Sequence, residues 1–208
     1  MIEITPIEYG KSVLKESVVF HAGCEDKLYP IVFMIYLIRT EDRTILVDAG
    51  CETMPGFMME DFQGAINAFK KHDVTPDEIT DVIITHAHHD HIECVKYFTN
   101  ALIHIQKDEY ESGRGYIPDN FKTNVFTDSF KVLENIRIIR IGGHSKGSCV
   151  VEINKDDKIF AIAGDECYSR LCLSEKRYTG SSFDEKASKD FILKYSDPKY
   201  TVLLCHDG

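Results

Sequence analysis

The chain has 208 residues, of which 43% are hydrophobic and 28% are charged, a composition typical of a folded domain rather than of a disordered chain. Its 34 acidic residues outnumber its 24 basic residues, which gives a formal net charge of −10. Because a surface of that sign repels phosphate, binding to nucleic acid or to an anionic membrane is not expected.

Short apolar runs rich in Ile and Val predict strands, since each run is closed by Gly, Asp or a charged residue. In chain order these strands are expected at residues 31–40, 44–50, 81–85, 101–106, 136–141, 149–153, 158–164 and 201–206. Helices are expected between them, at residues 60–72, 76–80, 92–98, 107–112 and 184–195. Strands in two groups, each interrupted by helices, predict an α/β fold with two packed sheets and helices outside.

The organisation of the chain predicts one domain over residues 1–208, because no linker, repeat or low-complexity segment interrupts it. Residues 111–128 are expected to form a loop, since Gly, Pro and Asn recur there. The seven cysteines are odd in number and include no CxxC pair, which favours reduced thiols in a cytoplasmic protein. The N-terminal residues lack the apolar core of a signal peptide.

Histidine is concentrated in one short segment: four of the nine histidines lie between His86 and His91, directly after a predicted strand. Neutral imidazole nitrogens and carboxylate oxygens suit zinc, iron or manganese. His86 and His88 point the same way if the chain stays extended, whereas Asp90 and His91 follow a turn and could serve a second ion. His89 is the expected non-ligand. The segment therefore predicts a metal site.

Further ligands are expected at other strand ends, because two histidines alone leave an ion short of ligands. His144, Asp165 and His206 each lie at the end of a later predicted strand. An earlier acid, Asp48, ends the second strand and is followed by Ala and Gly.

In this order the motifs resemble those of the metallo-β-lactamase superfamily, over nearly the whole chain. The five matching elements are Asp48-Ala-Gly, the segment His86 to His91, Gly143-His144-Ser, Gly164-Asp165 and His206. The resemblance implies a four-layered αβ/βα sandwich with a two-metal site along the upper edges of the sheets.

The resemblance also implies a ligand set for two divalent ions, expected to be zinc, with iron or manganese as alternatives. One ion would be held by His86, His88 and His144, the other by Asp90, His91 and His206, with Asp165 bridging the two. Asp48 would orient ligands from outside this set, consistent with the need to fix imidazole tautomers.

Within the superfamily the chain is most similar to the N-acyl homoserine lactone lactonases. Residues 29–50 resemble their opening hairpin, and residues 98–110 resemble the segment after their metal loop. Tyr168, three residues after Asp165, stands where those enzymes place a tyrosine whose hydroxyl meets the substrate carbonyl. The expected catalytic residues are Asp90, Asp165 and Tyr168, with Tyr168 also binding the small-molecule substrate.

The expected chemistry is hydrolysis, since two ions sharing a water generate hydroxide at neutral pH and polarise a carbonyl. The bridging hydroxide would attack the carbonyl of a lactone or a related carboxylic ester. The apolar side chains between residues 54 and 62 could line a pocket for the acyl chain of a substrate. The favoured interpretation is that they form the buried face of a helix. This group consists of Met54, Phe57, Met58, Met59 and Phe62.

Other activities of this fold stay open as alternatives. A glyoxalase II-like thioesterase would need a separate C-terminal domain, for which 208 residues are expected to leave no room. Phosphodiester cleavage in RNA is disfavoured by the acidic charge, and a β-lactamase usually carries a signal peptide. A diiron oxidoreductase is the alternative from another class, although its flavin-linked members use Glu where this chain has His88.

Overall fold

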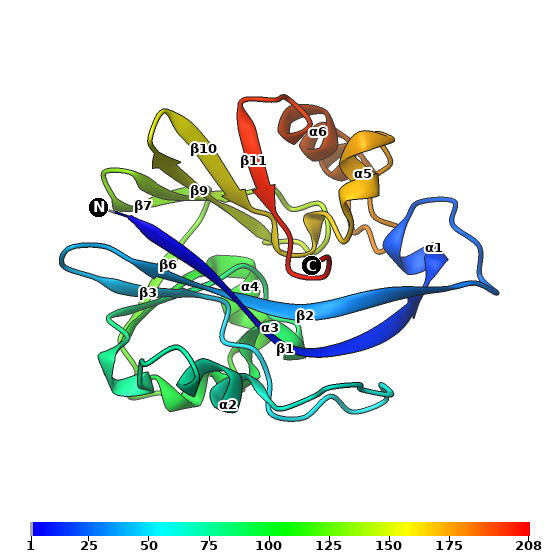
Figure 1. Ribbon diagram of the computed structural model, residues 1–208. Coiled ribbons are helices and arrows are strands. Elements are labelled where there is room, and N and C mark those ends of the chain that lie inside the picture. Colours follow the sequence, from blue (N-terminus) through cyan, green and yellow to red (C-terminus); the bar gives the residue numbers. More distant parts are fainter. Residues whose placement is uncertain (1) are drawn as a thin grey trace. The chain divides into compact units, whose positions relative to one another are not determined.

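The computed structural model describes residues 2–208, which divide into two compact units. Unit 1 consists of the residues up to Ser12 together with Val32–Phe126, and unit 2 consists of Val13–Ile31 and Thr127–Gly208. Figure 1 follows the chain through both units by colour. A single domain over residues 1–208 stays a prediction. Among residues 2–208, no helix has the length and apolar character needed to cross a membrane.

Most of the first sheet lies in unit 1, and the spatial order of its strands follows the chain, from β1 to β6. The strands are β1 Glu3–Lys15, β2 Leu28–Arg39, β3 Thr44–Val47, β4 Asp81–Ile84, β5 Leu102–Gln106 and β6 Thr123–Phe126. From β3 to β6 the neighbours are parallel, and β3 and β4 are buried along almost their whole length. Parallel strands end at a common edge, so the residues that follow β3 and β4 are brought together there.

The helices of unit 1 are short. They are α2 Ala65–Lys70, α3 His89–Ile92 and α4 Lys107–Gly113, with 3₁₀ turns at Pro76–Glu78 and Glu93–Tyr97. The helix expected at 60–72 begins only after Gly64, whose φ of 75° lies in the left-handed region that favours glycine.

The apolar group from Met54 to Phe62 therefore lies outside any helix. Its members are only partly covered: Phe57 is 37% exposed and Met58 is 86% exposed. The interpretation of this group as the buried face of a helix is wrong, and a role in a substrate pocket stays a prediction.

Unit 2 contains the second sheet, in the order β11-β10-β9-β8-β7. The strands are β7 Ser129–Leu133, β8 Ile136–Arg140, β9 Cys149–Lys155, β10 Lys158–Ile162 and β11 Tyr200–Leu203. β7 to β10 form an antiparallel meander, closed between β9 and β10 by Asp156 and Asp157 with positive φ. β11 pairs parallel to β10, so Asp165 and His206 follow strands that end at the same edge.

The helices of unit 2 are α1 Glu16–Val19, α5 Arg170–Ser174 and α6 Glu185–Tyr195. The carboxylate of Asp184 caps α6 by accepting a 3.0 Å hydrogen bond from the Ala187 N–H. In α6 the side chains of Phe191 and Tyr195 are buried. Tyr195 packs on Tyr200 of β11, with ring centroids 4.7 Å apart (Figure 1 shows α6 beside β11).

All the predicted strands are present, but β1, β6 and β7 were not anticipated, and β6 lies inside the expected loop at 111–128. These three strands share a position: each lies at the edge of its sheet. An edge strand is partly solvated and carries polar residues, so its apolar signal in the sequence is weak.

Candidate functional site

In unit 1, Asp48 and the segment from Thr85 to His91 meet at the carboxyl ends of β3 and β4. The Asp48 carboxylate is fully buried and accepts a 2.7 Å hydrogen bond from the Thr85 N–H and another, of 2.9 Å, from the Thr85 hydroxyl. Its Oδ2 also lies 2.7 Å from Nδ1 of His91. Asp48 therefore holds both ends of the histidine-rich segment, which is the orienting role that the sequence resemblance implies.

The predicted ligands of unit 1 come together as two pairs. Nε2 of His86 lies 3.1 Å from Nδ1 of His88, and Nε2 of His91 lies 3.4 Å from Oδ2 of Asp90. Donor atoms around a tetrahedral zinc ion are about 3.3 Å apart, because each lies about 2 Å from the metal. The spacing within each pair therefore fits two ligands of one metal ion. His86 and His88 are the pair expected at one ion, and Asp90 and His91 are the pair expected at the other.

His89 points away from these pairs, as its role of non-ligand requires. Its Nδ1 lies 3.2 Å from the Tyr116 hydroxyl, and its Nε2 lies 2.8 Å from the carbonyl oxygen of Thr53.

Two buried side chains that the sequence analysis did not single out hold the backbone of the same segment. The Tyr9 hydroxyl donates a 2.8 Å hydrogen bond to the Asp90 carbonyl, and the Glu109 carboxylate accepts one of 2.8 Å from the Ala87 N–H. Burial raises the pKa of Tyr9 well above its usual value. Glu109 belongs to a run of charged residues that predicts a solvent-exposed surface. Its buried position and its hydrogen bond are therefore seen only in the folded structure.

In unit 2, the Asp165 carboxylate lies between two histidines. Its Oδ1 is 3.0 Å from Nε2 of His206, and its Oδ2 is 3.5 Å from Nε2 of His144. The Tyr168 hydroxyl donates a 2.7 Å hydrogen bond to the same Oδ2. All four side chains are at most 5% exposed. The residues predicted in this half of the chain are therefore brought together.

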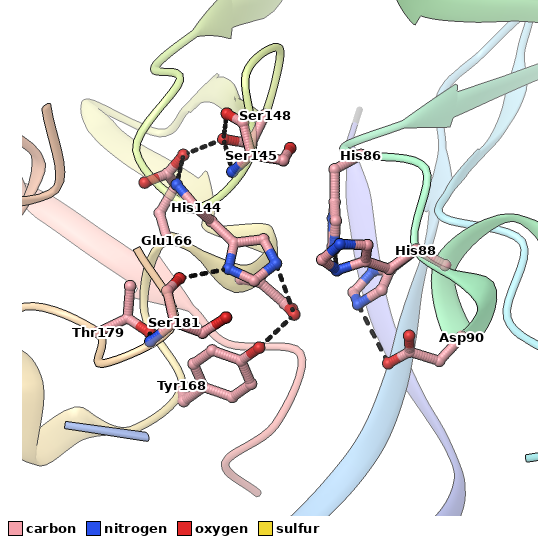
Figure 2. Close-up of polar contacts among 12 residues, drawn as sticks. His86, His88, Asp90, His144, Ser145, Ser148, Glu166, Tyr168, Thr179 and Ser181 are labelled. Carbon is pink, nitrogen blue, oxygen red and sulfur yellow. Dashed lines mark hydrogen bonds and ion pairs between the residues drawn. The ribbon is translucent and has the colours of Figure 1, made fainter. Parts of the chain in front are cut away.

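In two of the predicted ligands, His91 and His144, Nδ1 makes a hydrogen bond to another residue of the protein. Nδ1 of His144 donates to the carbonyl oxygen of Ser181 at 2.8 Å (Figure 2), and Nδ1 of His91 donates to Asp48. In both rings the Nδ1–H tautomer leaves the lone pair of Nε2 available to a metal ion. The chemistry of this donor set fits zinc or a similar divalent ion.

Glu166 is a further buried acid beside these residues that sequence reasoning missed. Its side chain is fully buried and accepts hydrogen bonds from the backbone around His144. Burial raises the pKa of Glu166 to about 7, against the opposing effect of these hydrogen bonds.

A sequence model described as "Metallo-beta-lactamase superfamily" matches residues 34–206. The N-acyl homoserine lactonase of Bacillus thuringiensis is 26% identical over 205 residues, covering 86% of this chain and 78% of the relative. The N-acyl homoserine lactonase AiiB of Agrobacterium fabrum is 30% identical over 105 residues, covering 43% of this chain and 38% of the relative.

Solved structures show the same fold. One is an N-acyl homoserine lactone hydrolase with the product N-hexanoyl-L-homoserine at its catalytic metal center, with a TM-score of 0.84 and 21% identity. That match covers 98% of this chain and 92% of the other. Another is AidC, a dizinc quorum-quenching lactonase, with a TM-score of 0.77 and 19% identity over 99% of this chain and 87% of the other.

These comparisons confirm the α/β fold and the resemblance to lactonases that the sequence motifs predict. The family match spans every motif from Asp48 to His206. The chain belongs to the metallo-β-lactamase superfamily.

Proposed function

We propose that this protein is a dinuclear metal-dependent hydrolase that opens lactones. The observation that carries the proposal is the Asp165 carboxylate, whose two oxygens each lie within 3.5 Å of an imidazole Nε2. A carboxylate with one donor nitrogen beside each oxygen is suited to bridging two cations. The family motifs assign the remaining nitrogens and the second carboxylate to the paired donors of unit 1.

The proposed ligands follow the family motifs. His86, His88 and His144 hold one ion, Asp90, His91 and His206 hold the other, and Asp165 bridges them. Imidazole and carboxylate donors suit zinc, with iron or manganese as alternatives. When bound, such ions generate hydroxide from water at neutral pH and polarise a substrate carbonyl.

The side chains of the protein orient these groups and complete the catalytic set. Asp48 fixes the His91 ring by accepting from its Nδ1, and Ser181 does the same for His144 through its carbonyl oxygen. Tyr168 offers the only phenol within hydrogen-bond reach of Asp165 among the contacts described for residues 2–208. Its O–H is the group we assign to the substrate carbonyl, where it would stabilise the negative charge that develops on oxygen.

The proposed substrate is an N-acyl homoserine lactone or a related small-molecule lactone. The relatives named above support this choice, since both curated proteins are N-acyl homoserine lactonases and one solved relative is a dizinc lactonase. They support it over the thioesterase, phosphodiesterase, β-lactamase and diiron alternatives. A cytoplasmic location stays our prediction, supported by seven free cysteines.

The experiment is a substrate panel assayed with the zinc-loaded full chain: N-hexanoyl-homoserine lactone, a glutathione thioester, a phosphodiester and a β-lactam. We expect opening of the lactone, and its loss in Asp165→Asn. The matched control is Asp190→Asn, which makes the same chemical change on an exposed residue of α6. Cleavage of another panel member without lactone opening would overturn the proposal, as would iron-dependent oxygen consumption by a coloured protein.

A further inference from the structure

Glu166 directly follows Asp165, yet its side chain is engaged with a different segment of unit 2. It is fully buried. A single oxygen, Oε1, accepts its hydrogen bonds. The Gly143 N–H donates to Oε1 at 3.1 Å. The His144 N–H donates to the same oxygen at 3.3 Å and the Ser148 hydroxyl at 2.5 Å (Figure 2 shows Glu166 beside His144 and Ser148). Glu166 thus contacts the backbone of a proposed ligand, whereas Asp165 contacts the imidazole of the same residue.

The three donors belong to the connection between β8 and β9, where the strand pairing ends after Arg140 and resumes at Cys149. In this connection Oε1 of Glu166 accepts all three hydrogen bonds and so satisfies two buried backbone N–H groups that folding removes from water. A buried carboxylate costs free energy that an apolar residue would avoid. The presence of an acid here therefore indicates a positioning role rather than a packing role.

Gly143 shows how closely the connection lies against the carboxylate. A Cβ added to Gly143 would lie 2.3 Å from Oε2 of Glu166 and 2.7 Å from Oγ of Ser188. No side chain fits in that space without movement of Glu166 or of α6. The glycine before His144 is thus required by the contact with Glu166.

Asp165 and Glu166 belong to one 3₁₀ turn, Gly164–Glu166. The two carboxylates are consequently fixed to each other through the backbone, one holding the main chain of His144 and the other lying 3.5 Å from its Nε2. We propose that Glu166 is a positioning residue of the metal centre, which sets the separation between His144 and Asp165. The inference rests on the proposed function.

The test measures the zinc affinity of the full chain by competition with a chromophoric chelator, using Glu166→Ala and Glu166→Gln. Glutamine keeps an oxygen at the Oε1 position and places its NH₂ where Oε2 has no hydrogen-bond partner among the described residues. We expect Glu166→Ala to weaken zinc binding about ten- to a hundredfold, and Glu166→Gln to recover most of that loss.

The control is Glu152→Gln, since Glu152 is another carboxylate of unit 2 that accepts hydrogen bonds, from Tyr195 at 2.7 Å and from Lys194 at 3.0 Å. This variant should lower the free energy of unfolding and leave the zinc affinity unchanged. If Glu166→Ala does not fold, Ser148→Ala removes one donor while keeping the carboxylate, and severalfold weaker zinc binding is expected.

A folded Glu166→Ala or Ser148→Ala protein that binds zinc as tightly as the parent would overturn the inference. The proposed function fails separately, and only if the parent chain itself binds no zinc or opens no lactone.

Discussion

The Tyr168 hydroxyl donates a 2.7 Å hydrogen bond to Oδ2 of Asp165, the carboxylate we propose as the metal bridge. The Tyr168 ring also stacks on His206, with centroids 5.0 Å apart and an interplanar angle of 16°. Stacking fixes the ring before any substrate binds, and the hydroxyl would turn its single proton from Asp165 to a substrate oxygen once the carboxylate binds metal. Such preorganisation is what a donor to a developing oxyanion needs.

Replacing Tyr168 by Phe should therefore reduce turnover rather than metal binding. We expect kcat for lactone opening to fall about a hundredfold, because the variant loses one hydrogen bond to the charge that develops on the substrate oxygen. The zinc content should equal that of the parent chain. Steady-state kinetics and metal analysis check the two expectations, and unchanged lactone turnover would remove Tyr168 from the catalytic set.

Replacing Asp48 by Asn should weaken metal binding. Asp48 has a φ of 61°, and Asn tolerates that left-handed conformation as well as Asp does, so the substitution tests the charge rather than the backbone. The amide cannot accept from Thr85 and His91 in the way that the carboxylate does. We expect zinc affinity to fall about ten- to a hundredfold in a chelator competition. Parent-like affinity in the folded variant would contradict the orienting role.

Thiol labelling of the native protein should modify one cysteine rapidly. Cys24 is exposed, whereas the other six cysteines described by the structure are buried. Burial raises the pKa of Cys51 to about 12 and so suppresses the reactive thiolate. Labelling with a chromogenic disulfide should show about one fast thiol per chain. That phase should vanish in Cys24→Ser, and its persistence in this variant would contradict the described burial.

The contribution of Asp81 to stability should depend on pH. Burial raises the pKa of Asp81, but hydrogen bonds from His104, Thr80 and Arg43 outweigh burial and hold the pKa below its ordinary value. Because the pKa of Asp81 is lower in the folded chain than its value of about 3.8 in the unfolded chain, the ionised carboxylate stabilises the fold at pH values above 3.8. This stabilisation is lost as the pH falls through the pKa of the folded state.

We expect Asp81→Asn to lower the free energy of unfolding by about 3 kcal/mol at neutral pH, since it leaves a buried network without its charge. Urea unfolding across the acidic range should show the difference shrinking below about pH 4. The exposed control Asp190→Asn should change little at any pH. A deficit for Asp81→Asn that stays constant down to about pH 3 would contradict the expectation.

The sequence was most informative where strands are buried and where they end. β4 and β10 are continuous apolar runs, and the ligands that follow them stand at the strand ends where family motifs place them. Edge strands such as β1 and β6 were missed because most of their residues are exposed or only partly buried, which weakens the apolar signal. The apolar group near Phe57 was misread, since its spacing resembles a helix while Gly64 delays the helix.

The supporting carboxylates could not be predicted in the same way. Glu109 and Glu166 stand in charged or polar stretches, where an acid usually faces water. Their role depends on contacts with Ala87 and Gly143, which are distant in sequence and are brought near only by folding. Local patterns therefore identify the proposed ligands but not the residues that hold those ligands in place.

The most direct test of the central claim is a zinc titration of the chelator-treated full chain, in which opening of N-hexanoyl-homoserine lactone is followed at each step. The account predicts no opening without metal, and activity that rises until about two ions are bound per chain. Full activity in the metal-free protein, or no lactone opening once about two ions are bound, would contradict it.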